Sequence, residues 1–174
     1  ALANSQLEEI HKFLDGSTAI RVARYTGQEK DDERKEIKAT PPDILLTNYV
    51  MLDLILTRYQ QDHEILRAAQ QLEFLVLDEL HTYRGRQGAD VAMLVRRLRN
   101  QLHADNLLCI GTSATMASVG SEEDRRTAVS KVASKLFDTS IPPENVIMEV
   151  LEYATVKMTA AGLKQKLPDR LKQR

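Results

Sequence analysis

Two carboxylates stand together after an apolar run and could serve a phosphoryl-transfer site. Asp78 and Glu79 directly follow the run Phe74–Leu77, and His81 comes shortly after them. One carboxylate in such a position can hold Mg²⁺ through its water ligands, while its neighbour takes the proton from an attacking water. The other interpretation is an acidic pair that only caps the next segment, and the spacing alone leaves both open.

A cluster of hydroxyl side chains follows a second apolar run. The sequence GTSAT at 111–115 comes directly after the run at 107–110 and places Ser113 and Thr115 on either side of a small residue. Hydroxyls in such a turn can relay hydrogen bonds, although a Ser-x-Thr sequence after a strand is more often a turn or a helix cap. The two clusters are informative only in combination.

The segments that must position these clusters alternate between strand and helix patterns. Apolar runs predict strands at 19–25, 43–47, 74–77, 107–110 and 146–151, and helical spacing predicts helices at 2–14, 49–59, 62–71, 88–102 and 121–138. We expect the strands at 43–47 and 74–77 to be buried, the first on both faces. The alternation predicts an α/β fold with a mostly parallel sheet, in which ligands gather at the carboxyl ends of the strands.

Composition restricts the class of protein without naming a partner. The chain has 174 residues, 43% hydrophobic and 28% charged, which is the balance of one globular domain. Its 24 Lys and Arg nearly cancel its 25 Asp and Glu, so any nucleic-acid contact must come from local charge. Cys109 is the only cysteine, which excludes a disulfide within the chain. No apolar stretch approaches the roughly 20 residues of a membrane span, and we expect a cytoplasmic protein with no membrane partner.

With both clusters in this order, the chain resembles the DEAD/DEAH-box superfamily 2 helicases. Asp78-Glu79-Leu80-His81 is similar to motif II, Ser113-Ala114-Thr115 to motif III, Thr47-Asn48 to motif Ib, Tyr25-Thr26-Gly27 to the glycine element before it, and Ala1 to Gln6 to the end of motif Ia. The resemblance spans residues 1–151. The phrase LDELHTYRG at 77–85 is most similar to the Lhr-like and YprA-like branch, which includes helicases of bacterial phage-defence systems.

The resemblance implies a RecA-like three-layer fold with a mostly parallel central sheet, and ATP and Mg²⁺ as cofactors. Asp78 would hold Mg²⁺ through water, and Glu79 would orient and deprotonate the attacking water. His81 would bond towards Ser113 or Thr115 and so couple hydrolysis to domain movement. A satisfied buried imidazole is the plain alternative for His81.

The resemblance also implies a nucleic-acid site, with DNA preferred to RNA. Thr26, Gly27, Thr47 and Asn48 would contact the sugar-phosphate backbone of one strand, because hydroxyls, amides and backbone N–H groups bind phosphate without reading sequence. Ordinary turn and helix-cap chemistry would explain the same residues. The further partner implied is a second RecA-like domain of the same parent chain.

One element of the family pattern is missing. The phosphate-binding loop G-x-x-x-x-G-K-S/T does not occur, since none of the seven glycines precedes a lysine. We therefore expect residues 1–151 to be an N-terminally truncated RecA-like ATP-binding domain 1, inactive alone, and residues 152–174 to be a basic linker or the start of another domain. A non-catalytic RecA-like module that binds nucleic acid or a partner protein is the alternative. A receiver-type domain with Asp78 as phosphate acceptor would leave His81 unexplained.

Overall fold

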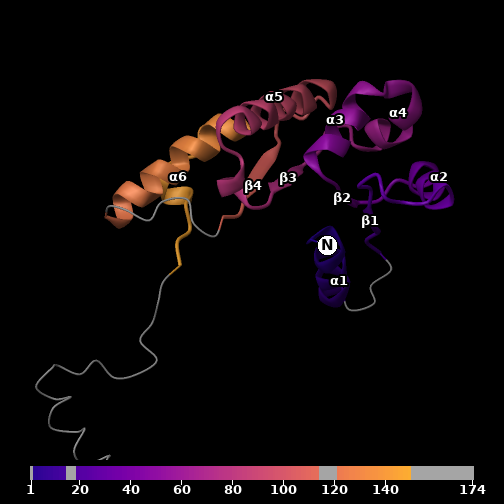
Figure 1. The fold of residues 1–174 in the computed structure, drawn as a ribbon, viewed down its shortest axis with the longest axis horizontal. Coiled ribbons are helices and arrows are strands. Elements are labelled where there is room, and N and C mark those ends of the chain that lie inside the picture. The colour runs from indigo at the N-terminus through magenta and orange to yellow at the C-terminus, as the bar shows by residue number, and fades with distance from the viewer. Residues whose placement is uncertain (1, 15–18, 114–120, 150–174) are drawn as a thin grey trace, which may run out of the picture.

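The computed structural model describes residues 2–14, 19–113 and 121–149. The helices in these ranges are α1 Leu2–Leu14, α2 Asp31–Ala39, α3 Tyr49–Thr57, α4 Tyr59–Ala68, α5 Gly85–Gln101 and α6 Glu122–Phe137. The strands are β1 Val22–Arg24, β2 Ile44–Leu46, β3 Phe74–Leu77 and β4 Leu108–Gly111, and short 3₁₀ turns lie at Leu80–Thr82 and Pro143–Asn145. Helix and strand therefore alternate as the apolar patterns predict (Figure 1).

All strand pairing in the described residues is parallel, which confirms the predicted α/β class. β1 pairs with β2 in the register Val22 to Ile44, and β3 pairs with β4 in the register Phe74 to Leu108. The strands form two separate two-stranded sheets instead of the single sheet expected. Packing holds the pairs together in place of hydrogen bonds, because one apolar cluster contains residues from both pairs, including Leu45 of β2 and Leu75 of β3.

Helix α5 organises the core by contributing to two apolar clusters. Leu94 and Leu98 belong to the cluster that spans both strand pairs, while Val91 and Val95 pack with Phe137 of α6. Within each of these pairs the residues are four positions apart, so each pair forms one stripe of the helix. The second cluster also takes in Leu77 at the end of β3, and it therefore supports the carboxylates that follow.

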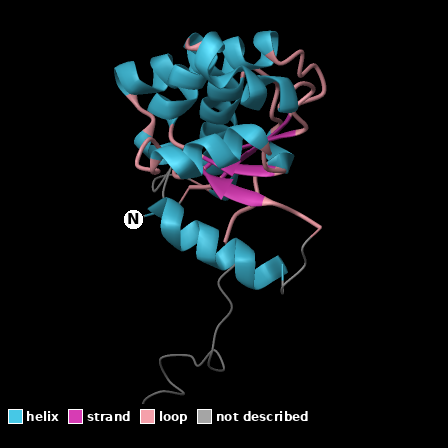
Figure 2. Ribbon diagram, turned by 90° about the vertical axis from the view of Figure 1, so that its right-hand side faces the viewer, coloured by secondary structure: helices cyan, strands magenta, loops and turns pink. Residues whose placement is uncertain are grey.

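The expectation that β2 is buried on both faces is wrong, and β3 is also less buried than expected. Phe74 and Val76 of β3 are 55% and 57% exposed, and Ile44 of β2 is also exposed. The reason is that most of the helices gather on one side of the strands, while α1, the helix at the N-terminus, lies on the other (Figure 2). In the described ranges, α1 has its main contacts with β1, so the outer face of β3 and β4 stays accessible.

The chain after α6 also departs from the prediction. Residues 146–149 form no strand, although their apolar pattern predicted one, and residues 150–151 lie outside the described part. A strand needs a partner for its backbone groups, and the Val146 carbonyl instead accepts a hydrogen bond from Arg126 Nη1 at 2.7 Å. Within the described residues, none of the helices has the length and apolarity needed to span a membrane.

Candidate nucleotide and nucleic-acid sites

The register of β3 and β4 brings the two clusters of polar residues side by side. Leu77 lies opposite Gly111, so Asp78 and Thr112 are the next residues along each strand. The pairing continues past the strand ends, because Thr112 N donates to Leu77 O at 3.1 Å and Leu80 N donates to Thr112 O at 2.8 Å. The predicted proximity of the carboxylates and the hydroxyls is therefore present.

A glycine permits this close approach. A Cβ atom on Gly111 would lie 2.3 Å from Leu80 Cδ1, well inside normal contact distance. Leu80 is buried next to Val91 and Phe137, so its side chain has little freedom to move away. Gly111 thus allows the turn that carries Glu79 and Leu80 to fold back over β4.

The Asp78 carboxylate is half-buried and accepts hydrogen bonds on both oxygens. Oδ1 accepts from the Thr112 hydroxyl and from Glu79 N, the latter at 3.1 Å. Oδ2 accepts from Gln6 Nε2 at 2.6 Å. In the described ranges, no three His, Cys, Asp or Glu side chains converge on a metal position. One carboxylate beside a hydroxyl matches the way Mg²⁺ binds with most of its waters and substrate phosphates retained.

Glu79 adopts a strained backbone conformation that aims its side chain at His81. Its φ and ψ of 55° and 50° lie in the left-handed region, which a non-glycine residue enters only where the surroundings impose it. His81 Nδ1 lies 3.1 Å from Glu79 Oε2 and 3.4 Å from Ser113 Oγ. The expected approach of His81 to Ser113 is therefore present, and Thr115 lies outside the described residues.

The structure adds two residues to this cluster that the sequence analysis gave no role. Thr112 could have been found, because it follows β4 at the position that corresponds to Asp78 after β3. Gln6 carried no such signal, since it lies 72 residues from Asp78 and on a different element. Tyr83 packs close by, where burial raises the pKa of its phenol and the Asp78 charge adds to that effect.

A second polar cluster lies at the carboxyl ends of β1 and β2. Tyr25 N donates to Leu46 O at 2.8 Å, which extends the pairing beyond β1. The Thr47 hydroxyl then donates to Tyr25 O at 2.7 Å, and Asn48 Nδ2 donates to Thr26 O at 3.2 Å. All four residues predicted to contact nucleic acid, Thr26, Gly27, Thr47 and Asn48, are thus gathered in one place.

A buried carboxylate, Glu29, holds the turn in this cluster. It accepts from Thr26 N at 2.9 Å, from the Thr26 hydroxyl at 2.8 Å and from Gly27 N at 2.8 Å. Burial alone would raise the pKa of Glu29, but these hydrogen bonds outweigh burial and hold the pKa below its usual value. The backbone N–H groups of Thr26 and Gly27 therefore already donate to a side chain of the same turn.

Tyr25 anchors the same turn from the core side. Its hydroxyl donates to Asp62 Oδ1 at 2.9 Å, and Lys38 Nζ lies 2.9 Å from the same oxygen. Burial, followed by the hydrogen bond with Asp62, raises the pKa of Tyr25 to about 12. Asp62 sits at a non-helical position inside α4, so this polar contact coincides with a kink in that helix. No pattern in the sequence indicated either Glu29 or Asp62.

Comparison with known proteins identifies a family for this arrangement. The family model described as DEAD/DEAH box helicase matches residues 1–122. The chain is 38% identical over 131 residues to Druantia protein DruE of Escherichia coli (strain UMEA 4076-1), which covers 66% of this chain and 7% of that protein. It is 31% identical over 121 residues to the uncharacterized ATP-dependent helicase YprA of Bacillus subtilis (strain 168), covering 68% of this chain and 16% of that protein.

A solved structure shows the same fold. The DUF1998 helicase MrfA, in a crystal structure bound to DNA and AMPPNP, matches 79% of this chain and 18% of its own length, with a TM-score of 0.59 and 26% identity. The chain thus spans less than a fifth of each of these relatives. The match of the family model extends over more than half of the residues. The chain belongs to the DEAD/DEAH box helicase family.

Proposed function

We propose that the chain supplies part of the first RecA-like motor domain of an ATP-dependent helicase that moves on DNA in preference to RNA. The observation that carries the proposal is the meeting of Asp78, Glu79 and His81 with Ser113 at the ends of β3 and β4. YprA is named an ATP-dependent helicase, and MrfA has been crystallised with DNA and AMPPNP, which supports both the nucleotide and the DNA.

In this proposal each residue of the first cluster has one task. Asp78 would hold Mg²⁺ through water, with the Thr112 hydroxyl orienting its carboxylate, and the ion when bound would supply charge neutralisation at the phosphate oxygens. Glu79 orients the attacking water and accepts its proton. His81 lies between Glu79 and Ser113, so it joins the base to the turn that follows β4. Thr115 takes part in the same coupling.

The remaining parts of the motor come from outside these residues. The chain has no G-x-x-x-x-G-K-S/T sequence, so another segment must cradle the phosphates. Residues 1–151 are then part of RecA-like domain 1, and residues 152–174 lead to a second RecA-like domain or form a linker. By itself the 174-residue chain would not hydrolyse ATP.

The second cluster is the proposed contact with the nucleic-acid strand. Asn48 caps α3 by accepting from Met51 N at 2.8 Å, so the positive end of this helix lies at the Thr26–Gly27 turn. A helix start of this kind attracts a backbone phosphate without reading sequence. Thr47 and Asn48 supply the polar side chains there, while Glu29 fixes the shape of the turn.

The test is the isosteric replacement Glu79→Gln in the whole protein. Turnover of ATP should fall at least roughly a hundredfold, the usual effect of losing a general base, while nucleotide binding is retained. Glu73→Gln is the matched control, because Glu73 is exposed and immediately precedes the same strand, at the end away from Glu79. Unchanged turnover in Glu79→Gln would remove Glu79 from the mechanism. Absence of hydrolysis in the wild type would favour a non-catalytic module that binds nucleic acid or a partner protein.

A further inference from the structure

Helix α1 touches both polar clusters through two neighbouring amide side chains. Gln6 Nε2 donates to Asp78 Oδ2 at 2.6 Å, and Asn4 Oδ1 accepts a hydrogen bond from Arg24 Nη1. Residues two positions apart on a helix project towards different sides. The spacing of Asn4 and Gln6 is therefore the one that lets a single helix reach the ends of β1 and β3 together.

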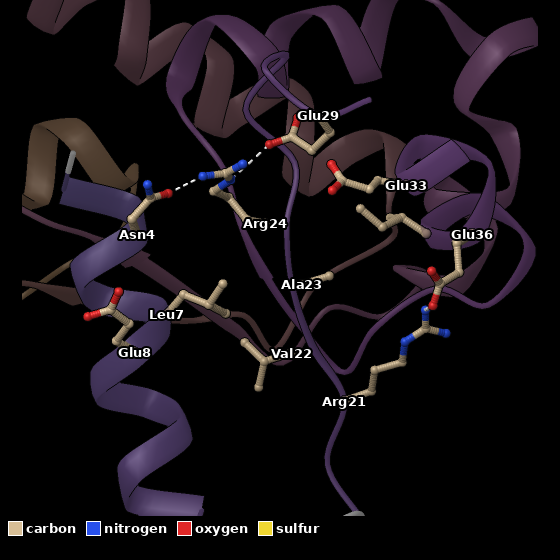
Figure 3. A pocket seen from close by; sticks show the side chains of 11 residues that line it. Asn4, Leu7, Glu8, Arg21, Val22, Ala23, Arg24, Glu29, Glu33 and Glu36 are labelled. Carbon is tan, nitrogen blue, oxygen red and sulfur yellow. Dashed lines mark hydrogen bonds and ion pairs between the residues drawn. The ribbon is translucent and has the colours of Figure 1, made fainter. Parts of the chain in front are cut away.

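Arg24 continues the connection from α1 to the turn proposed to contact nucleic acid. Its Nε donates to Glu29 Oε1 at 3.0 Å, and Figure 3 shows its guanidinium between Asn4 and Glu29. The Glu29 side chain is only 3% exposed. It holds the backbone N–H groups of Thr26 and Gly27, as described above. Direct side-chain contacts, together with the body of α1, therefore link Asp78 to the Thr26–Gly27 turn.

We propose that α1 couples the nucleotide site to the nucleic-acid site, with Gln6, Asn4 and Arg24 as positioning residues. The inference rests on the proposed function. Asp78 Oδ2 is bonded to Gln6, so water ligands of Mg²⁺ that approach Asp78 compete with this amide. Release of Gln6 frees α1 to shift. That shift passes through Asn4 and Arg24 to Glu29, which changes how the Thr26–Gly27 turn meets a phosphate.

The two amides allow a matched pair of isosteric variants. At Gln6 the amide nitrogen makes the hydrogen bond, so Gln6→Glu removes the donor and places a second carboxylate next to Asp78. At Asn4 the amide oxygen makes the hydrogen bond, so Asn4→Asp keeps an acceptor for Arg24. The same chemical change should therefore break the connection at one position and preserve it at the other.

The experiment measures binding of fluorescein-labelled oligo(dT) to the whole protein with and without AMPPNP and Mg²⁺. Coupling between the two sites is measured as the ratio of the dissociation constant with AMPPNP and Mg²⁺ to the one without them. In the wild type we expect the two constants to differ by at least about fivefold. Gln6→Glu should bring the ratio below about 2. Arg24→Lys should do the same, because a single ammonium cannot hold Asn4 and Glu29 as the guanidinium does. Asn4→Asp should retain the wild-type ratio, as should Glu9→Gln, an exposed control on α1.

The outcomes separate this inference from the proposed function. If Gln6→Glu and Arg24→Lys keep the wild-type ratio, α1 does not carry the coupling. A wild-type ratio of one in a protein whose ATP hydrolysis is stimulated by DNA would overturn the inference and leave the proposed function standing. A wild type that neither hydrolyses ATP nor binds oligo(dT) would instead refute the proposed function. If Gln6→Glu weakens oligo(dT) binding equally with and without AMPPNP, Gln6 has only a structural role, and this result would also overturn the inference.

Discussion

Replacing Gly111 by alanine tests whether the close approach of Leu80 to β4 builds the carboxylate site. The new Cβ would lie 2.3 Å from Leu80 Cδ1, 3.0 Å from Leu80 Cγ and 3.3 Å from Phe137 Cε2. Ordinary carbon contacts begin near 3.5 Å, so Leu80 has to move by about 1 Å. Leu80 is 3% exposed and closely packed, which leaves the backbone of the Glu79–Leu80 turn to take up the shift.

The expected cost follows from overpacking. An extra methyl group in a packed core destabilises the folded state by about 1–3 kcal/mol. Replacing Gly by Ala also lowers the conformational entropy of the unfolded chain, which stabilises the folded state by about 0.4–1 kcal/mol. The net destabilisation of Gly111→Ala is therefore centred on about 1.3 kcal/mol. With a urea slope of about 2 kcal/mol/M, the midpoint of urea unfolding should fall by about 0.5–1 M. Circular dichroism during urea titration of the chain measures this shift.

A double-mutant cycle shows whether Leu80 is the cause. Leu80→Ala alone should cost about 2–5 kcal/mol, because it empties a buried site. Adding Gly111→Ala to that variant should cost much less than it does alone, since the two Leu80 atoms are gone and only the 3.3 Å contact with Phe137 Cε2 remains. The difference is the coupling between the two positions, and we expect about 1 kcal/mol. An unchanged midpoint for Gly111→Ala, or strict additivity in the double variant, would refute the reasoning.

Three other changes test separate parts of the structure. Replacing both Ser113 and Thr115 with alanine in the whole protein should lower DNA unwinding more than ATP hydrolysis, and equal losses would contradict coupling. Tyr25 has a folded pKa of about 12 against an ordinary value of 10.0, so its contribution to stability is complete below pH 10 and is lost as pH rises through 12. The loss due to Tyr25 should total about 2–3 kcal/mol in urea titrations. Tyr25→Phe should remove this part of the pH dependence and leave the part that comes from Tyr83, whose pKa is also raised; an unchanged slope would exclude Tyr25 as a source. Ser121 accepts from Asp124 N at 3.1 Å as the cap of α6, so Ser121→Ala should cost about 1 kcal/mol and Ser121→Asn much less, a contrast that thermal unfolding can measure.

The sequence predicted those parts of the site that depend on local pattern. Asp78 directly follows one apolar run and Ser113 lies shortly after another, and parallel strands bring such ends together. The same reasoning predicts that Thr26 and Thr47, which follow two other strands, lie close together. These inferences needed only the order of strands and helices along the chain.

The parts that sequence could not supply depend on tertiary contacts. Gln6 reaches Asp78, and Asn4 reaches Arg24, only because α1 packs against β1 within reach of the end of β3. The apolar run that starts at Val146 has strand-forming residues, yet Ile147 is 95% exposed and the described part of the run has no partner strand. An apolar pattern shows that a segment can form a β-strand, but the strand forms only where the edge of a sheet is available for pairing.

The most direct test of the central claim is ATP hydrolysis by the whole protein, with and without single-stranded DNA, beside the 174-residue chain under identical conditions. We expect DNA-stimulated turnover in the whole protein and none in the chain alone. Absence of ATP hydrolysis in both proteins would contradict the motor function. ATP hydrolysis by the chain alone would show that its phosphate site lies within these residues.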